Sequence, residues 1–352
     1  MQHTRWPHQC VRCQADCFHS TPLLGERQNV TTAARRLGTT DIEITPVAMG
    51  CWPISGMTSL DVNEADSLKT LRAAKDAGVN FFDTAYCYGR DGESERLIAR
   101  LLSEDRESIV IATKGGIHWQ ADGARALDAS PERLRQQCDE SLRRLETDYV
   151  DLLYLHAPDP NVPVAESAGE FKSLLDAGKT RSIGVSNFNI DQLNAFHAVC
   201  PISAVQPAYN MLQREIETDI VPWCLEHHVS IVVYWPLLKG LLAGKLTRDH
   251  QFRDGDGRPK YVMFQGEQWN KNHDLIDQLR TIAESIGKTV AQMVVNWTVH
   301  QPGITAALCG AKRAYQIEET AGAMGWTLDD ETSRQIEQAL QRRGQPLSQA
   351  AV

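Results

Sequence analysis

The sequence lacks the features that would place the protein in a membrane, outside the cell or on a nucleic acid. No stretch approaches the roughly 18 consecutive apolar residues of a membrane helix, and the N-terminus has no apolar secretory core. Positive charge is scarce, because 36 lysines and arginines stand against 45 aspartates and glutamates, for a net charge of −9. This balance argues against nucleic acid or an anionic membrane surface as the main partner. We therefore expect a cytoplasmic globular protein and leave its oligomeric state open.

The cysteines do not form a disulfide pattern. Nine of them are scattered along the chain, which is typical of free thiols in a reducing compartment. Cys10, Cys13, Cys17 and His19 offer four zinc ligands, but short Cys/His clusters are often incidental. The segment also lacks the apolar residues needed to fold by itself. We expect residues 1–34 to be a disordered extension, or sequence upstream of the true start, and we predict no metal site.

From about residue 35 the chain alternates between strand and helix patterns. Continuous apolar runs, typical of parallel strands covered on both faces, occur at 47–52, 79–85, 108–116, 149–157, 180–188, 204–210, 230–236 and 304–310. Helical periodicity occurs at 63–78, 92–104, 130–146, 164–178, 189–199, 215–228 and 272–287. No G-x-G-x-x-G follows the first run, so eight strands favour a (β/α)₈ TIM barrel over a doubly wound sheet.

This barrel is predicted to occupy residues 35–352 as a single domain. Residues 35–46 read as a β-hairpin ahead of the first barrel strand, placed to plug the bottom of the barrel. Residues 248–272 form a long polar, Gly-rich connection, and barrel enzymes carry substrate-binding groups on such loops.

Polar side chains end three neighbouring strands of the predicted barrel. Asp83 ends the second strand, with Tyr88 in the loop behind it; Lys114 ends the third strand and His156 the fourth. Taken singly, each has an ordinary structural explanation, but together they form an acid–base device. A nearby ammonium lowers the pKa of a phenol, so we expect Lys114 to lower the pKa of Tyr88, Asp83 to support Lys114, and His156 to orient a carbonyl oxygen.

From about Arg35 to residue 341 the chain resembles the aldo-keto reductase superfamily, of the bacterial type related to potassium-channel β subunits. The four residues match the family tetrad in order and strand context, and "GVSNF", "VQPAYN", "GLLAGK" and "GAK…IEET" match its other landmarks. The resemblance implies an oxidoreductase that transfers hydride between NADP(H), or NAD(H), and a small aldehyde, ketone or sugar. The implied partner is a small carbonyl or alcohol substrate.

The resemblance also implies a set of cofactor-binding residues. Ser186, Asn187 and Gln206 match positions that hold the nicotinamide carboxamide, and Tyr234 matches the aromatic that stacks on the ring. The remaining implied cofactor positions are Trp235, Pro236, Leu237, Lys245, Gly310, Lys312, Arg313, Gln316, Glu319 and Thr320. Lys312 and Arg313 are the cations available to the 2′-phosphate of NADPH, and Glu319 matches an adenine-contacting acid.

Three of these positions depart from the family pattern. Trp235 stands where relatives carry a small residue, Gln316 where many NADPH-specific members carry Arg, and Thr320 where Asn is frequent. These departures leave dual specificity or a preference for NAD open.

The substrate pocket is predicted from three side chains. Trp52 matches an aromatic of the family pocket, and His118 and Trp119 follow Lys114 closely enough to line the same mouth. Two other functions remain open: a cofactor-sensing subunit of the same fold that turns over slowly, and an isomerase or aldolase in which Lys114 forms a Schiff base.

Overall fold

The structure is a computed structural model that describes residues 34–57, 60–103 and 105–346. The predicted N-terminal extension, with its cluster of Cys10, Cys13, Cys17 and His19, therefore lies outside the described residues apart from Ala34.

Eight parallel strands close into a barrel, as the sequence predicts. They are β3 (Val47–Gly50), β4 (Phe81–Asp83), β5 (Val110–Gly115), β8 (Leu152–Leu155), β9 (Ile183–Ser186), β10 (Ala204–Gln206), β11 (Ser230–Val233) and β12 (Ile304–Gly310). Each corresponds to one of the predicted apolar runs. The strands pair in chain order, and β12 closes the ring against β3. The fold is a (β/α)₈ TIM barrel.

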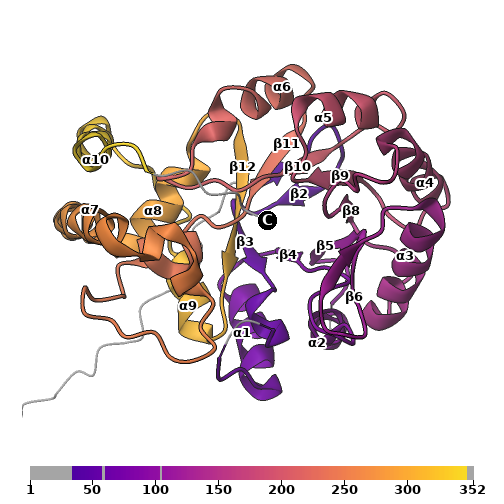
Figure 1. The fold of residues 1–352 in the computed structure, drawn as a ribbon, viewed down its shortest axis with the longest axis horizontal. Helices are drawn as coiled ribbons and strands as arrows, with labels where there is room; N and C mark the ends of the chain where they lie inside the picture. Colours follow the sequence, from indigo (N-terminus) through magenta and orange to yellow (C-terminus); the bar gives the residue numbers. More distant parts are fainter. Residues whose placement is uncertain (1–33, 58–59, 104, 347–352) are drawn as a thin grey trace, which may run out of the picture. The chain divides into compact units, whose positions relative to one another are not determined.

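Helices lie outside this ring (Figure 1). They are α1 (Glu64–Asp76), α2 (Glu93–Leu102), α3 (Pro131–Leu145), α4 (Val164–Asp176), α5 (Ile190–His197), α6 (Ile220–Glu226), α7 (Gly266–Ser285), α8 (Val290–Val299), α9 (Ala314–Ala321) and α10 (Asp330–Arg343). Short 3₁₀ turns add η1 (Pro53–Ser55), η2 (Glu215–Glu217), η3 (Leu238–Ala243), η4 (Arg258–Lys260) and η5 (Val262–Phe264). No helix among the described residues is long and apolar enough to cross a membrane.

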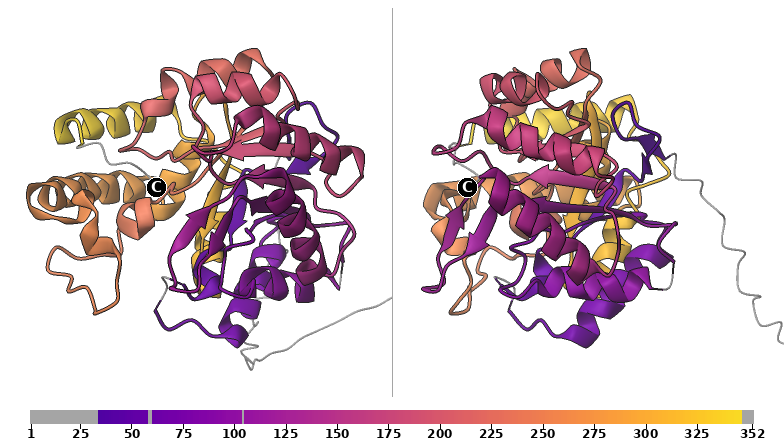
Figure 2. Two further views of the ribbon diagram at one scale, coloured as in Figure 1. Left: turned by 45° about the vertical axis from the view of Figure 1, so that its right-hand side comes forward. Right: turned by 90° about the vertical axis from the view of Figure 1, so that its right-hand side faces the viewer.

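Two predicted helix boundaries differ from the observed ones. The segment 215–228 divides into η2 and α6, because the Asp219 carboxylate accepts a hydrogen bond from the amide of Ile220 and starts a new helix. The helix predicted from residue 272 begins six residues earlier, at Gly266, so the long connection is shorter than expected. Beyond the ring, α10 packs along α7, as Figure 1 and the left view of Figure 2 show.

The predicted N-terminal hairpin closes one end of the barrel. Strand β1 (Arg35–Arg36) pairs antiparallel with β2 (Glu43–Ile44). Leu37, Ile42 and Ile44 are at most 2% exposed and share a cluster with inward-facing strand residues such as Phe81. Burial of such side chains stabilises each by about 1.5–3 kcal/mol relative to exposure, so the hairpin is an integral plug.

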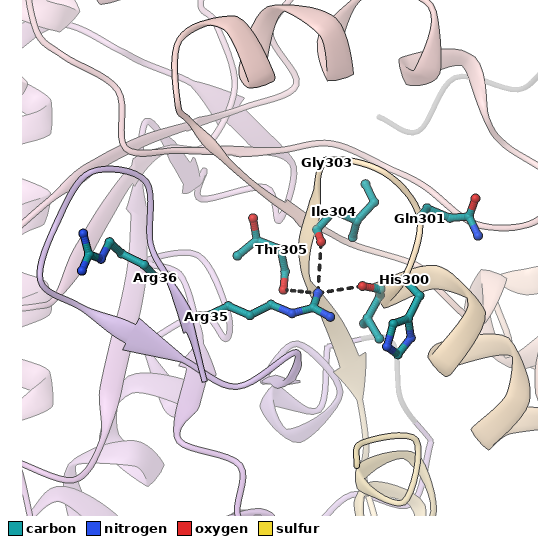
Figure 3. Close-up of a pocket in the computed structure, with 8 residues that line it drawn as sticks. Arg35, Arg36, His300, Gln301, Gly303, Ile304 and Thr305 are labelled. Atoms are coloured by element: carbon teal, nitrogen blue, oxygen red, sulfur yellow. Dashed lines mark hydrogen bonds between the residues drawn. The ribbon is translucent and has the colours of Figure 1, made fainter. Parts of the chain in front are cut away.

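Arg35 ties this hairpin to the barrel wall. Its Nη1 donates to the carbonyls of Val299 (2.6 Å), Ile304 (3.1 Å) and Thr305 (3.0 Å), beside a surface hollow of about 430 Å³ (Figure 3). Val299 is the last residue of α8, where unpaired carbonyls carry partial negative charge. The contact therefore caps α8 and also anchors the N-terminal hairpin to the barrel.

A second hairpin follows β5 and was not predicted. Strands β6 (Ile117–Trp119) and β7 (Arg125–Leu127) pair antiparallel beside the barrel. Asp122-Gly123 between alternating apolar residues is the sequence signal that would have indicated this turn. The hairpin carries His118 and Trp119, two of the predicted pocket residues.

Candidate active site

The four predicted catalytic side chains meet at the carboxyl ends of β4, β5 and β8. Strand register brings them together, since Asp83 pairs with Ala112, and Lys114 lies two residues further along β5, opposite Tyr154 of β8. His156 follows β8 directly. Parallel strands present their carboxyl ends at one face of a barrel, where such enzymes have their active sites.

Lys114 is the centre of this group. Its Nζ donates to Asp83 Oδ1 (2.5 Å), to the carbonyl of Thr84 (2.8 Å) and to Tyr88 Oη (3.3 Å). Lys114 and Asp83 are each 1% exposed. A second donor reaches the carboxylate, because Gln206 Nε2 lies 2.9 Å from Asp83 Oδ2. All three ammonium hydrogens thus have acceptors, and the ion pair is fixed in geometry.

The pKa of Tyr88 is shifted upward overall, so burial outweighs the lowering predicted from Lys114. Burial of the phenol, followed by the charge of Asp83, raises its pKa well above the ordinary value. The main physical reason is burial, because a charged phenolate in this site would lose its hydration. Tyr88 is therefore a neutral hydroxyl that holds a proton, and Lys114 is placed to stabilise the phenolate only when that proton leaves.

His156 is held neutral. Burial and the positive charges of Lys114 and Arg125 lower its pKa well below the ordinary value. Its ring lies edge-on to Tyr88, with the two ring centres 5.9 Å apart, and its Nδ1 lies 3.7 Å from Cys87 Sγ. A neutral imidazole beside a neutral phenol presents two groups able to donate a hydrogen bond to one oxygen atom.

The predicted nicotinamide-binding residues form one connected group on β9, β10 and β11. Tyr234 Oη donates to Asn187 Oδ1 (2.8 Å), and Asn187 Nδ2 donates to Ser186 Oγ (3.1 Å) and to the carbonyl of His156 (3.1 Å). Asn187 has a positive φ of 62°, which an Asn adopts more readily than most residues. An aromatic ring held beside side-chain amides is a donor set that fits a flat heteroaromatic ring bearing a carboxamide.

The segment after β11 is strained and cationic. Trp235, Leu238 and Lys239 have positive φ values of 61°, 43° and 54°, which is unusual for such side chains. The Lys239 ammonium lies 3.7 Å from the ring centre of Trp235 and 4.4 Å from that of Tyr261. Burial, and then Lys260 and Arg125, lower the pKa of Lys239 to about 8. Pro236 and Leu237, two of the implied cofactor positions, lie in the turn between Trp235 and this lysine.

The residues predicted for the adenine end lie around the start of α9, beyond Gly310 at the end of β12. Lys245 Nζ forms an ion pair with Glu319 Oε1 at 2.9 Å. Gln316 Oε1 accepts from the backbone amides of Lys312 (2.9 Å) and Arg313 (3.1 Å), so it caps the helix.

Two of the implied adenine-end side chains thus form hydrogen bonds within the protein. The hydroxyl of Thr320 donates to the carbonyl of Gln316 inside α9 (3.1 Å), and the residue is 6% exposed. The Oε1 of Gln316 is likewise occupied as a cap.

The predicted pocket aromatics surround Tyr88. The ring centre of Trp52 lies 5.0 Å from that of Tyr88, edge-on. Trp119 Nε1 donates to the carbonyl of Cys87 (2.9 Å), and the buried His118 Nδ1 has no hydrogen-bond partner among the described residues. His118 and Trp119 lie on β6, which follows β5 and its Lys114 directly. No cluster of three or more His, Cys, Asp or Glu in the described ranges is arranged to hold a metal ion.

Sequence reasoning missed some residues that contact this site. Cys87 adjoins His156, and the only signal for it was its position next to Tyr88. Lys239 lies in the "PLLKGLLAGK" run, but its place over Trp235 depends on a strained turn. Asp61, in the loop after η1, lies against Arg253, Lys312 and Arg313, and no sequence motif indicates it.

Comparisons with known proteins agree with one another. The model of the Aldo/keto reductase family matches residues 46–341. Aldo-keto reductase YhdN of Bacillus subtilis (strain 168) is 37% identical over 305 residues, covering 86% of this chain and 92% of that protein. The NADH-specific methylglyoxal reductase of Escherichia coli (strain K12) is 31% identical over 324 residues, covering 87% and 98%. The glycerol dehydrogenase AKR11B4 of Gluconobacter oxydans has a similar structure, with a TM-score of 0.84, 34% identity, and coverage of 92% and 99%.

Proposed function

The chain belongs to the aldo/keto reductase family, and from this membership we propose that it is an NAD(P)H-dependent oxidoreductase. It interconverts a small aldehyde, ketone or sugar with the corresponding alcohol. The observation that carries the proposal is the Lys114 ammonium, which contacts both the Asp83 carboxylate and the Tyr88 hydroxyl at the barrel mouth.

Tyr88 is the proposed general acid. When bound, the nicotinamide supplies the hydride that reaches the carbonyl carbon, and Tyr88 gives its hydroxyl proton to the carbonyl oxygen. The phenolate left behind lies against the Lys114 ammonium, whose charge is held in place by Asp83. Solvent returns the proton. The reverse reaction, alcohol oxidation, uses the same phenolate as a base.

His156 positions the substrate rather than acting as an acid. Its imidazole is neutral at physiological pH because its pKa is depressed, so one ring nitrogen can donate to the carbonyl oxygen beside Tyr88. Trp52 and Trp119 would close the apolar sides of the pocket. In this proposal the substrate carbonyl reaches Tyr88 between these two side chains.

Ser186, Asn187, Gln206 and Tyr234 would hold the nicotinamide. The pyrophosphate would lie along residues 235–245, and the adenine end would lie near Glu319 and the cations at the start of α9. Lys312 and Arg313 support use of NADPH, whereas the related E. coli enzyme is named as NADH-specific. We propose that both cofactors bind.

The second candidate is a cofactor-sensing subunit that binds but hardly turns over. The aldolase alternative receives no support, because the three hydrogen bonds of Lys114 Nζ favour a charged ammonium over the free amine that a Schiff base needs.

Fluorescence titration with NADPH and NADH, followed by turnover on a panel of aldehydes, ketones and sugars, separates the candidates. The reductase predicts micromolar binding together with turnover on the order of 1 s⁻¹ or faster. Tight binding with negligible turnover on the whole panel would favour the sensor. If neither NADPH nor NADH binds, both the reductase and the sensor proposals are overturned.

A further inference from the structure

The segment Leu60–Asp61 lies against the two cations predicted for the 2′-phosphate. Lys312 Nζ donates to the carbonyl of Leu60 (2.9 Å), and Arg313 Nη2 donates to the carbonyl of Asp61 (2.7 Å). The Asp61 carboxylate is paired with Arg253 of the connection between β11 and α7. Three cations from two distant parts of the chain therefore contact the segment Leu60–Asp61.

Asp61 is ionised at neutral pH. The hydrogen bond from Arg253 and that residue's charge, together with the more distant charges of Lys312 and Arg313, hold the pKa of the Asp61 carboxyl below its usual range. A second carboxylate is close, because Asp66 Oδ2 lies 3.7 Å from Arg313 Nη1. Part of the positive charge that a phosphate would meet is thus already neutralised by the protein.

A phosphate monoester carries about −1.5 to −2 charges at pH 7. Bound by Lys312 and Arg313, a 2′-phosphate would enter the field of the Asp61 carboxylate and be repelled by it. The 2′-hydroxyl of NADH carries no charge and would feel little of this repulsion. Gln316 caps α9 and adds no cation to compensate.

We propose that Asp61 is a specificity-determining residue that disfavours the 2′-phosphate and shifts the cofactor preference toward NADH. The inference rests on the proposed function, since it requires the adenine ribose of a nicotinamide dinucleotide to lie near Lys312 and Arg313. Because the Asp61 side chain is 61% exposed, its charge can be removed without opening the core, and the backbone contacts of Lys312 and Arg313 do not depend on the side chain.

The test compares Asp61→Asn with Asp254→Asn, a matched control. Asp254 lies next to Arg253 in sequence, and its removal changes the net charge equally, yet no contact joins it to Lys312 or Arg313 among the described residues. Dissociation constants for NADPH and NADH are measured by fluorescence at low and high salt, with 2′,5′-ADP and 5′-AMP as competing probes.

We expect Asp61→Asn to bind NADPH and 2′,5′-ADP more tightly, on the order of 3- to 10-fold at low salt, because one negative charge near the phosphate is removed. The dissociation constants of NADH and 5′-AMP should change less than about twofold. Asp254→Asn should leave the ratio of the NADPH and NADH dissociation constants near that of the wild type. The gain in NADPH affinity of Asp61→Asn should shrink in 0.5 M salt. The inference is overturned if the ratio of the NADPH and NADH dissociation constants changes equally in both variants, or if Asp61→Asn binds NADPH more weakly than the wild type.

The two proposals fail in different ways. A chain that binds both cofactors with an unchanged ratio loses only the role of Asp61. A chain in which the ratio shifts as expected but no carbonyl is reduced keeps that role and loses the reductase assignment. A chain that binds neither cofactor loses both.

Discussion

Replacing Lys114 with methionine tests the buried ion pair on which the site depends. The substitution keeps most of the side-chain volume but leaves the Asp83 carboxylate, 1% exposed, with Gln206 as its remaining side-chain donor. Removing one partner of a buried pair typically costs about 3–5 kcal/mol. The carboxyl can escape part of that cost by taking up a proton, which from an unfolded pKa near 3.9 costs about 4 kcal/mol at pH 7. We therefore expect a loss of about 3–4 kcal/mol at pH 7.

The destabilisation caused by Lys114→Met should depend on pH. Burial already raises the pKa of Asp83 against the opposing effect of Lys114, and removal of the lysine raises that pKa further. A group with a raised folded-state pKa contributes stability that is lost as the pH rises through that pKa. Since protonation at pH 5 costs only about 1.5 kcal/mol, the penalty for Lys114→Met should shrink by about 2 kcal/mol between pH 7 and pH 5.

Urea denaturation at both pH values measures this effect, where unfolding is two-state. The double variant Asp83→Asn/Lys114→Met should regain most of the loss, because no buried charge remains. Lys172→Met is the control, since the Lys172–Asp176 pair is exposed and should contribute less than about 0.5 kcal/mol. A Lys114→Met variant as stable as wild type at pH 7, or a penalty that does not change with pH, would show that the Asp83–Lys114 pair does not stabilise the fold in this way.

Three further predictions concern the rest of the described structure. The pKa of His156 is depressed in the folded state, so the free energy of unfolding should fall by up to about 1.4 kcal/mol per pH unit as the pH drops below about 6.5. In urea denaturation, the free energy of unfolding of His156→Asn should depend less on pH over that range than that of the wild type. Gly184→Ala would place its Cβ 2.4 Å from the ring of Tyr154 and should destabilise the barrel by about 2–3 kcal/mol, measured by thermal denaturation. Arg35→Ala should cost about 1.5–3 kcal/mol through the three lost carbonyl contacts, and hydrogen exchange should show faster opening at the end of α8.

The barrel and the placement of the tetrad were predictable from the sequence for a physical reason. Parallel strands covered on both faces are continuous apolar runs, so their ends are visible, and barrel closure brings those ends to one mouth. Asp83, Lys114 and His156 could therefore be placed together although Lys114 lies 31 residues from Asp83.

What sequence reasoning could not reach depends on tertiary distances. The pKa of Tyr88 is raised by its burial and by the charge of Asp83, and neither effect follows from spacing. Asp61 meets Arg253, which is 192 residues away, through two irregular loops that carry no periodic signal. The β6–β7 hairpin was missed because two short strands of three residues are outweighed by the longer barrel pattern around them.

The central claim is that the Tyr88 hydroxyl gives its proton to the carbonyl oxygen. Its most direct test is a single-turnover measurement of hydride transfer, followed by cofactor fluorescence, in wild type and in Tyr88→Phe loaded with the preferred cofactor and a substrate from the panel. We expect unchanged cofactor affinity and a rate of hydride transfer lower by about 10²–10⁴-fold. Hydride transfer in Tyr88→Phe at close to the wild-type rate would contradict it.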